Sequence, residues 1–436
     1  MQATATPLPA YVAEFRSVFA KEDFDILPEH RKWDHAIELI PGAEPKSSKV
    51  YPLSLLEQAK LDAFLEENLR TRRIRPLKSS IAASMFFIKK KDGLLHLVQD
   101  YCMLNAVTIK NRYPLPLISE LVSQLRGVRY FTKLDVHWGF NNVRIKPGDE
   151  WKAAFHTNCG LFKPLVMFFG MTNSPATFQT MMNNVFRTVI AEGIVVVYLD
   201  NILIFTKTEE EHERAVQRVL EILTEHKLFL HLEKCEFHRK QIEYLGLVIS
   251  ENKVVMDPVK VAGVREWPVP ENRTNVQAFI GFINFYCHFI QGFSIIARPL
   301  FDLTHSDQAW NWGTKKQEAF ERLKMAVTTA PTLASPQDSE PFCIEADSLD
   351  FTSGAVLSQQ LPGEEKWHPV AFYSKSLSLV EQNYEIHDKE MLAIICALEE
   401  WRHFLEGACY PVEIWTDHKN LEYFMMAKKL NHRQAQ

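Results

Sequence analysis

The chain has 436 residues, 46% of them hydrophobic and 24% charged, which is the composition of a folded protein with room for two or three domains. Its net charge of −5 excludes a uniformly basic nucleic-acid coat, so binding to nucleic acid would require a local basic patch. No apolar run approaches the roughly 18 residues that span a bilayer, and the N-terminal residues lack the pattern of a signal peptide. We therefore expect an intracellular protein that is not secreted.

Cysteines and basic residues are distributed in two informative ways. The seven cysteines are scattered and form no Cys-x-x-Cys pair, which favours free buried thiols over disulfides or a zinc site. Eight Lys or Arg residues and no acidic residue lie between Arg70 and Lys91. Because this run contains Phe-Phe-Ile and ends in Lys-Asp-Gly, it is typical of a hairpin with basic flanks rather than of a solvated tail.

Helix and hairpin patterns dominate the first part of the chain. Apolar residues recur at helical spacing behind Ser54, which is a suitable N-cap, and predict a capped helix. An Asp-Gly pair between two apolar runs predicts a hairpin turn. The elements predicted here are a helix over 9–19, a helix over 55–70, a hairpin over 84–101 that turns at Asp92-Gly93, and a helix over 117–126.

The stretch 194–206 has the most regular pattern of the chain, because one apolar run leads up to Asp200-Asn201 and another follows. It predicts a hairpin with these two residues as its turn, since both residue types tolerate positive φ. A strand that ends on Asp135 and a helix that begins at Ser174-Pro175, with Ser174 as its cap, are also predicted. The remaining elements predicted in this part are strands within 151–169 and a helix over 209–225.

Helices are expected first, and strands later, in the rest of the chain. An aromatic-rich helical region is predicted over 275–293, and the Pro-rich stretch 330–341 marks the clearest domain boundary. The other predicted elements are strands over 341–347, 351–360, 371–377 and 411–417, and a helix over 388–407. This last helix is expected to bury one stripe that includes Met391, Ile395 and Leu398.

Carboxylates recur where the predicted strands end. Asp135 and Asp200 end two strands of the first part, whereas Asp347 and Asp417 end two strands of the last part, with Glu390 one turn inside a helix. Any one of these residues alone is typical of a cap or a turn. Five of them in two sets indicate sites for Mg²⁺, which prefers carboxylate oxygens, waters and substrate phosphates. Two such ions about 3.5–4 Å apart promote phosphoryl transfer.

Ordered motifs in the first part resemble the palm of a reverse transcriptase of the gypsy-like (Metaviridae) LTR retrotransposons. They are FTKLD at 131–135, FGMTNSPATFQ at 169–179, YLDN at 198–201, LEKCEF at 232–237 and YLGLVIS at 244–250. The last part resembles the ribonuclease H of the same class through IEADSLDFTSGAVLSQ, YSKSLSLVEQNYEIHDKEMLAIICALEEW and IWTDHKNLEYF. The resemblance runs from about residue 10 to the last residue.

This resemblance implies an α+β fold, in which a fingers-palm-thumb reverse transcriptase precedes an incomplete ribonuclease H-like α/β domain. The implied domains are a leader over 1–45, fingers and palm over 46–257, thumb and connecting helices over 258–335, and a C-terminally truncated ribonuclease H-like domain over 336–436. The implied function is RNA-directed DNA synthesis by part of a retrotransposon Pol polyprotein.

The same resemblance implies the partners and the cofactor. The partners would be an RNA or DNA template-primer and deoxynucleoside triphosphates, with no membrane partner, and the sequence does not bear on oligomeric state. Each of the two active centres would use two Mg²⁺ ions, with Mn²⁺ as an alternative. The protein would act in a cytoplasmic particle or in the nucleus.

Individual residues take roles from the family motifs that they match. Asp135 and Asp200 match metal ligands of the polymerase. Phe140 matches the aromatic residue that stacks under the deoxyribose and excludes a 2′-hydroxyl, and Phe169 matches a contact with the incoming nucleotide; core packing is the alternative for both rings. The other matches are Lys90 to a triphosphate contact in the fingers, Lys234 to a proton donor for pyrophosphate, Leu245 and Gly246 to the primer-grip strand, and Asp347, Glu390 and Asp417 to three ribonuclease H metal ligands.

The sequence departs from the family pattern at the tip of the polymerase hairpin. Asn201 stands within the catalytic set where the family has a second aspartate. An amide keeps the shape and offers an oxygen, but it removes a full negative charge beside two divalent cations. We therefore predict strongly impaired polymerisation. Further residues replace a usual Arg or Pro in ways that C-to-T changes explain, which suggests a decayed copy: His96, Leu97, Cys102, His137, Cys287, His288 and Leu379.

The C-terminal end of the chain bears on the second active centre. The chain stops at Gln436, soon after Asp417, whereas the family continues through a helix with a fourth acidic ligand. We therefore expect weak or no RNA cleavage and a poorly stable second domain. The rival hypothesis for the whole chain is a non-catalytic nucleic-acid-binding remnant. Both hypotheses predict salt-sensitive binding to a template-primer, so only primer extension separates them.

Overall fold

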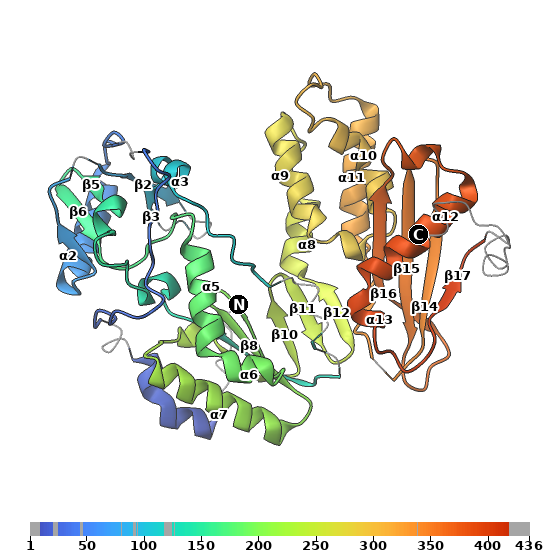
Figure 1. Cartoon of the computed structure of the whole chain (residues 1–436), viewed down its shortest axis with the longest axis horizontal. Helices are drawn as coiled ribbons and strands as arrows, with labels where there is room; N and C mark the ends of the chain where they lie inside the picture. The colour runs from blue at the N-terminus through green and yellow to red at the C-terminus, as the bar shows by residue number, and fades with distance from the viewer. Residues whose placement is uncertain are drawn as a thin grey trace. The chain divides into compact units, whose positions relative to one another are not determined.

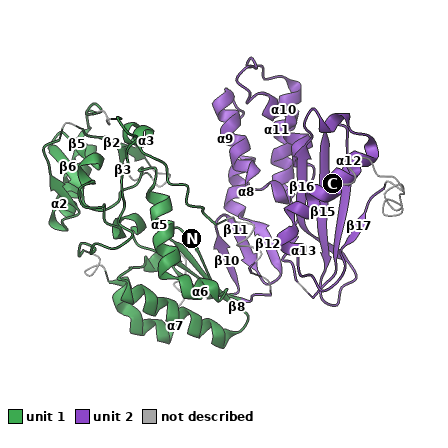
Figure 2. Ribbon diagram, viewed as in Figure 1, with its two compact units in different colours: residues 1–117, 130–239 green, residues 118–129, 240–436 purple. Residues whose placement is uncertain are grey.

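The computed structural model describes residues 9–20, 25–43, 47–79, 81–89, 93, 95–116, 124–125, 127–337 and 339–417. The chain divides into two compact units, which Figure 2 distinguishes by colour: unit 1 comprises residues 1–117 and 130–239, and unit 2 comprises residues 118–129 and 240–436. Both units combine helices with largely antiparallel sheets, as the expected α+β class requires. Within the described ranges, no helix has both the length and the apolar character needed to cross a bilayer.

The first part of unit 1 follows the sequence patterns closely. Its elements are η1 (Ala10–Phe19), α2 (Leu55–Arg70), β1 (Ile74–Pro76), β2 (Ser84–Lys89), β3 (Leu95–Asp100) and α3 (Cys102–Val107). Helix α2 begins with a capping box, because the Ser54 hydroxyl accepts the N–H of Glu57 and the Glu57 carboxylate accepts the N–H of Ser54. The helix predicted over 9–19 is instead a 3₁₀-helix that is interrupted at Phe15, where φ is −99° and ψ is 29°.

The hairpin predicted over 84–101 is present as the antiparallel pair β2–β3. Of its predicted turn, Asp92 lies outside the described residues. The helix predicted over 117–126 also lies outside them, except for positions 124 and 125. Its existence therefore stays a prediction.

The second part of unit 1 is built around a four-stranded sheet with the order β7-β8-β4-β9, which we call the palm sheet (Figure 1). Its strands are β4 (Tyr130–Asp135), β7 (Val195–Tyr198), β8 (Asn201–Thr206) and β9 (Glu236–Arg239). The other elements are η2 (Gly139–Asn142), η3 (Glu150–Ala153), β5 (Phe155–Thr157), β6 (Gly160–Pro164), α5 (Ser174–Val185), α6 (Arg187–Ala191), α7 (Glu209–Glu225) and η4 (Leu232–Lys234). Helix α7 has the predicted bounds and joins the same apolar core as β8 through a buried stripe that includes Val216 and Leu220.

Two details of this region correct the sequence predictions. The hairpin turn consists of Leu199 and Asp200, not of Asp200 and Asn201, because Asn201 pairs with Tyr198 and begins β8. The positive φ of the turn, +53°, falls on Leu199. Likewise, α5 has Asn173 as its N-cap residue, so Ser174 is the first residue of the helix.

Unit 2 contains two four-stranded sheets, with the orders β10-β11-β12-β13 and β16-β15-β14-β17. Their strands are β10 (Gln241–Tyr244), β11 (Leu247–Ser250), β12 (Lys253–Met256), β13 (Leu333–Ala334), β14 (Phe342–Ser348), β15 (Thr352–Gln360), β16 (Trp367–Ser376) and β17 (Glu413–Trp415). The helices are α8 (Pro258–Arg265), α9 (Arg273–Asn284), η5 (Cys287–Phe289), α10 (Phe293–Asp302), α11 (Thr314–Thr328), η6 (Glu381–Asn383), α12 (Ile386–Glu400) and α13 (Arg402–Leu405). The Pro-rich stretch 330–341 lies within unit 2.

The stripe predicted for α12 is confirmed only in part, because Leu398 packs against the core but the most buried side chains are others. Ile395 is 45% exposed, whereas Ala393, Ile394 and Ala397 belong to the buried core under the second sheet. Small side chains allow the helix to approach the sheet closely, so its alanine face turns inward. The prediction that the cysteines are free is confirmed for all seven, whereas the prediction that they are buried is wrong except for Cys343.

A fully buried histidine links the two central strands of the palm sheet. His212 of α7 lies 2.8 Å from Thr132 Oγ1 through Nε2 and 3.1 Å from Thr206 Oγ1 through Nδ1. Since the Thr206 hydroxyl donates to the carbonyl of Thr208, Nδ1 must donate to Thr206 and Nε2 must accept from Thr132. Burial, with a smaller effect from His238, lowers the pKa of His212 to about 3.

We predict that His212→Phe lowers the free energy of unfolding by roughly 1–3 kcal/mol, because the Thr132 hydroxyl loses its acceptor. A histidine whose pKa is lowered by folding binds fewer protons folded than unfolded. The contribution of neutral His212 to the free energy of unfolding is therefore fully present above pH 6.5 and is lost as the pH falls toward 3. The His212→Phe variant should not lose stability in this way. Denaturant unfolding between pH 4 and 8 measures it. Arg214→Gln, an exposed change on the same helix, should match the wild-type profile.

Candidate active sites

Asp135, Asp200 and Asn201 meet at one end of the palm sheet. Asp135 ends β4 and is paired across the sheet with Asn201, the first residue of β8. Asp200 precedes Asn201 in the turn, and its carbonyl accepts the N–H of Val136 at 2.9 Å. Two adjacent strands therefore bring Asp135 and Asp200 together, as the sequence predicted.

The carboxylates of Asp135 and Asp200 have different charged neighbours. The ammonium of Lys234 lies 3.3 Å from Asp135 Oδ1. Burial, together with the negative charge of Asp135, raises the pKa of Asp200, while Lys234 acts in the opposite direction. Asn201 Nδ2 donates to Asp200 Oδ1 at 3.2 Å. The amide thus supplies a donor to Asp200 at the place where an aspartate would add a second acceptor and a negative charge.

His137, one of the residues that departs from the family, lies close to the same end of β4. Its ring centroid is 4.6 Å from that of His231, and the N–H of His231 donates to the carbonyl of Asp135 at 2.9 Å. Burial, aided by neighbouring positive groups, lowers the pKa of His137 to about 4. At neutral pH this side chain therefore adds no positive charge beside Asp135.

The two phenylalanines predicted to contact the nucleotide lie against each other. The ring centroids of Phe140 and Phe169 are 4.8 Å apart in an edge-to-face arrangement, and Phe140 also contacts the buried ring of Phe178 at 5.5 Å. Phe169 is 51% exposed, whereas Phe140 packs against the core. The core alternative therefore describes Phe140 in part and does not describe Phe169.

Because Gly139 has no side chain, the backbone after Asp135 packs closely against Phe178 and Asp200. A Cβ at this position would lie 2.9 Å from Phe178 Cζ and 3.3 Å from the Cβ of Asp200. We predict that Gly139→Ala costs roughly 1–3 kcal/mol of unfolding free energy, because the rings or Asp200 must shift. Gly281→Ala in α9 is the control: a Cβ there meets no atom within 4 Å, so that change should be neutral or stabilising. Denaturant unfolding of both variants checks the difference.

The remaining predicted polymerase residues are found as follows. Lys234 lies in η4 with its side chain 58% exposed and paired to Asp135. Leu245 and Gly246 form the turn between β10 and β11 in unit 2, with φ of +51° and +83°. The hydroxyl of Tyr286 donates to the carbonyl of Gly246 at 3.2 Å and fixes this turn. Lys90 lies outside the described residues.

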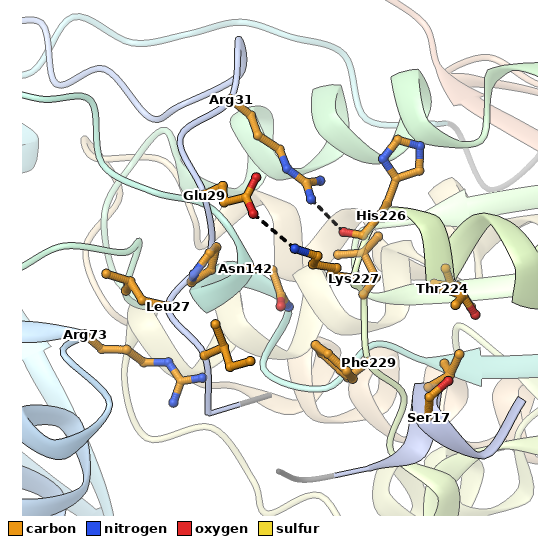
Figure 3. A pocket seen from close by; sticks show the side chains of 15 residues that line it. Ser17, Leu27, Glu29, Arg31, Arg73, Asn142, Thr224, His226, Lys227 and Phe229 are labelled. Carbon is orange, nitrogen blue, oxygen red and sulfur yellow. Dashed lines mark hydrogen bonds and ion pairs between the residues drawn. The ribbon is translucent and has the colours of Figure 1, made fainter. Parts of the chain in front are cut away.

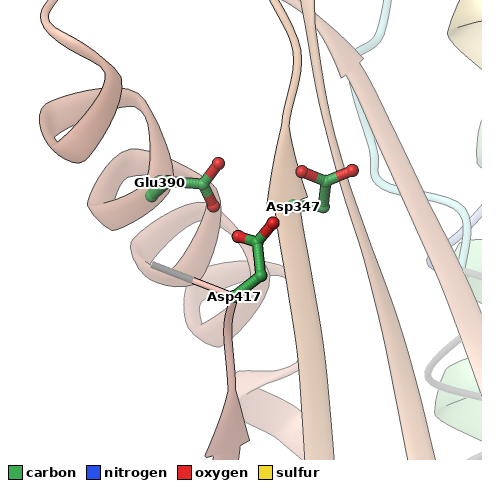
Figure 4. Close-up of side chains that lie close together, drawn as sticks. All are labelled: Asp347, Glu390 and Asp417. Atoms are coloured by element: carbon green, nitrogen blue, oxygen red, sulfur yellow. The ribbon is translucent and has the colours of Figure 1, made fainter. Parts of the chain in front are cut away.

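Three carboxylates of unit 2 form a cluster in which one oxygen of each lies within 4.8 Å of the others (Figure 4). Asp347 comes from β14, Glu390 from α12 and Asp417 from the segment after β17. Strands β14 and β17 are parallel, so their carboxyl ends meet at the same edge of the sheet. It is the one such cluster found among the described residues.

The electrostatics of this cluster favour a cation. Glu390 is 3% exposed, and its Oε1 accepts the N–H of Ser348 at 3.1 Å. Burial first, and then the charges of Asp347 and Asp417, raise the pKa of Glu390 to about 7. Three hard oxygen donors that repel one another, one of them buried, are a donor set suited to a divalent cation.

Sequence reasoning missed Gln179, which positions the polymerase hairpin. This side chain is fully buried; its Nε2 donates to the carbonyl of Val197 at 2.9 Å and its Oε1 accepts the N–H of Leu199 at 2.7 Å. It therefore supports the turn that carries Asp200. The only signal in the sequence is a polar residue next to buried Phe178 on an otherwise apolar helix face.

Two family models match the chain. The model for reverse transcriptase (RNA-dependent DNA polymerase) matches residues 88–249, and the model for the RNase H-like domain found in reverse transcriptase matches residues 312–414. The first range contains Asp135, Asp200 and Asn201, and the second contains Asp347 and Glu390. Domains of both kinds generally use divalent metal ions.

Curated relatives agree with these matches. Over 415 residues, or 95% of its length, the chain is 36% identical to the Transposon Tf2-7 and Transposon Tf2-3 polyproteins of Schizosaccharomyces pombe. The chain spans 31% of the length of these relatives.

Solved structures show the same fold. The foamy viral protease-reverse transcriptase in complex with double-stranded DNA matches with a TM-score of 0.78 and 18% identity, covering 99% of this chain and 81% of that chain. The same kind of enzyme in complex with an RNA/DNA hybrid matches with a TM-score of 0.72 and 18% identity, covering 100% of this chain and 62% of that chain.

The two family matches show that the chain contains a reverse transcriptase region followed by an RNase H-like region of the kind found in reverse transcriptases. The relatives named above are transposon polyproteins, in agreement with the retrotransposon origin that the sequence motifs predicted.

Proposed function

We propose that unit 1 is an RNA-directed DNA polymerase of a retrotransposon whose own rate of synthesis is strongly reduced by Asn201. The observation that carries this proposal is the meeting of Asp135 and Asp200 at one end of the palm sheet, with Asn201 paired opposite Asp135. Two strand-end carboxylates suit Mg²⁺, whereas an amide in the third position leaves the site one negative charge short.

In this proposal Asp135 and Asp200 would hold Mg²⁺, and the ion would supply the charge that promotes attack of the primer 3′-hydroxyl on the α-phosphate and departure of pyrophosphate. Lys234, already beside Asp135, donates a proton to pyrophosphate. The exposed face of Phe169 and the ring of Phe140 contact the base and sugar of the deoxynucleoside triphosphate. The substrate is thereby positioned by residues that the fold holds in place.

We further propose that Asp347, Glu390 and Asp417 hold Mg²⁺ for cleavage of RNA in an RNA/DNA hybrid. The clustering of the three carboxylates and the buried position of Glu390 support this role. The raised pKa of Glu390 falls when a cation binds, because the charged form of the carboxylate then gains a partner.

The experiment that tests the polymerase proposal uses a labelled DNA primer on an RNA template. The full chain should bind the duplex with an affinity that falls steeply as salt rises, since Lys and Arg contacts to phosphates release counterions. It should extend the primer poorly, Asn201→Asp should extend it well, and Asp200→Ala should not extend it. Binding without extension by every variant, including Asn201→Asp, would instead support a non-catalytic remnant.

A further inference from the structure

A cavity of about 260 Å³ lies in unit 1 beside the turn 136–139, which leads from Asp135 to Phe140 (Figure 3). Its wall is formed by the end of η1, the segment 26–31, the end of α7 with the residues that follow it, and the single residues Arg73 and Asn142. The cavity is separate from the Asp135–Asp200 pair, because neither residue lines it.

Much of the cavity wall is apolar. Val18 of η1 and Leu223 of α7 are 2% and 0% exposed, and Leu27 and Phe229 complete this side. A concave apolar wall excludes water and gains free energy when an apolar body covers it.

Charged side chains also line the cavity, and Figure 3 shows Arg31, Glu29 and Lys227 near one another with Arg73 beside Leu27. Lys227 is paired with Glu29 at 3.0 Å, and Arg31 Nη2 donates to the carbonyl of His226 at 2.9 Å. This bond of Arg31 is therefore made to a neutral carbonyl and not to a carboxylate. Among the described residues of the lining, Arg31, Arg73 and Lys227 are basic and Glu29 is acidic.

Arg73 adds a buried cation to this lining. It is 1% exposed, and burial lowers its pKa despite the opposing effect of the carboxylates Asp25 and Glu67. The positive charge of Arg73 adds to the electrostatic attraction that an anion in the cavity meets.

Three lining residues also hold the turn 136–139. Asn142 Nδ2 donates to the carbonyls of His137 and Gly139 at 3.1 and 3.2 Å. The carbonyl of Phe229 accepts the N–H of His137 at 2.7 Å, and the guanidinium of Arg73 lies 5.6 Å from the ring centroid of Trp138. A ligand that fixes these residues therefore restrains the turn.

We propose that this cavity binds a small amphipathic anion, namely a carboxylate or sulfonate on an aromatic or aliphatic body, and that binding restrains the turn between Asp135 and Phe140. The apolar wall receives the body and the cations receive the acid group. The proposal does not depend on polymerase activity, because binding and restraint are measured directly.

The test uses 8-anilinonaphthalene-1-sulfonate as the probe and its uncharged analogue N-phenyl-1-naphthylamine as the matched control. Fluorescence titration of the full chain should give saturable binding of one sulfonate, about tenfold tighter than the analogue. Arg31→Gln should weaken sulfonate binding about tenfold and leave the analogue unchanged. Arg16→Gln, an exposed cation of η1 outside the lining, should change neither affinity.

A second pair of variants tests the location. Thr224→Trp places an indole at the exposed rim and should weaken both probes about tenfold, whereas Glu225→Trp, an exposed neighbour outside the lining, should not. The sulfonate should slow hydrogen exchange of the amides of 136–139 in the wild type and not in Thr224→Trp. Equal sulfonate binding by the wild type, Arg31→Gln and Thr224→Trp, or unchanged exchange of this turn, would overturn the proposal.

Discussion

Asn201→Asp is expected to raise Mg²⁺-dependent primer extension by at least about a hundredfold, which is the scale of losing one strong electrostatic contact to a transition state. Asn201 is paired with Asp135 and follows Asp200, so an aspartate here adds its charge to both carboxylates. The change also removes the amide donor that now lies 3.2 Å from Asp200 Oδ1. Single-nucleotide incorporation on an RNA template, measured under single-turnover conditions, gives the ratio of rates.

Two controls separate charge from shape in this experiment. Asn201→Ala removes the amide without adding charge and should remain as slow as the wild type. Asp200→Ala, combined with Asn201→Asp, should abolish extension because a predicted metal ligand is lost. A wild-type rate equal to that of Asn201→Asp would show that the missing charge is unimportant.

Glu390→Gln is expected to have opposite effects with and without metal. In metal-free buffer at pH 8 the variant should melt about 2–4 °C higher than the wild type, because it removes a buried charge beside Asp347 and Asp417. With Mg²⁺ at 100 times its dissociation constant, the wild type should gain about 2.7 kcal/mol and become the more stable of the two. Calorimetry of both proteins, first with chelator and then with Mg²⁺, shows which of the two is more stable in each condition.

The pH dependence of the metal-free wild type follows from the same group. Folding raises the pKa of Glu390 from 4.5 to about 7, so the folded chain binds more protons between these values. The contribution to stability is fully present below pH 4.5 and is lost as the pH rises through 7. Glu399→Gln, an exposed change on the same helix, should behave as the wild type, and a Glu390→Gln variant that responds to Mg²⁺ and pH as the wild type does would contradict the proposed site.

Local patterns predicted those elements whose stability is itself local. Helix α2 has a capping box at Ser54 and helical spacing, and the pair β2–β3 lies on either side of an Asp-Gly sequence, so both were evident in the sequence. The cluster of Asp347, Glu390 and Asp417 was also predictable in part. Asp347 and Asp417 follow strand-like runs, and the two strands are parallel neighbours in the sheet.

The errors arose where distant residues decide the local structure. The hairpin turn moved by one residue because Asn201 pairs with Asp135 and Gln179 binds the backbone at Leu199, and neither partner is near in sequence. Periodicity suggested the buried face of α12 only in part, since it cannot distinguish a close alanine contact from a larger apolar stripe.

The basic run from Arg70 to Lys91 shows a further limit of sequence patterns. It suggested basic flanks of a hairpin, yet Arg73 is 1% exposed and Arg70 is paired with Asp25 at 2.6 Å. The fold brings these side chains into contact with segments that are distant in sequence. One of them, Arg73, lines a cavity that no sequence motif indicated.

Mn²⁺ binding is the most direct test of the proposal that Asn201 leaves the polymerase site short of negative charge. An Asp347→Asn, Glu390→Gln background removes the second site, and electron paramagnetic resonance then counts bound Mn²⁺ with a template-primer present. The account predicts that adding Asn201→Asp strengthens Mn²⁺ binding at unit 1 about tenfold or more. Equal Mn²⁺ affinity with Asn201 and with aspartate at this position would contradict it.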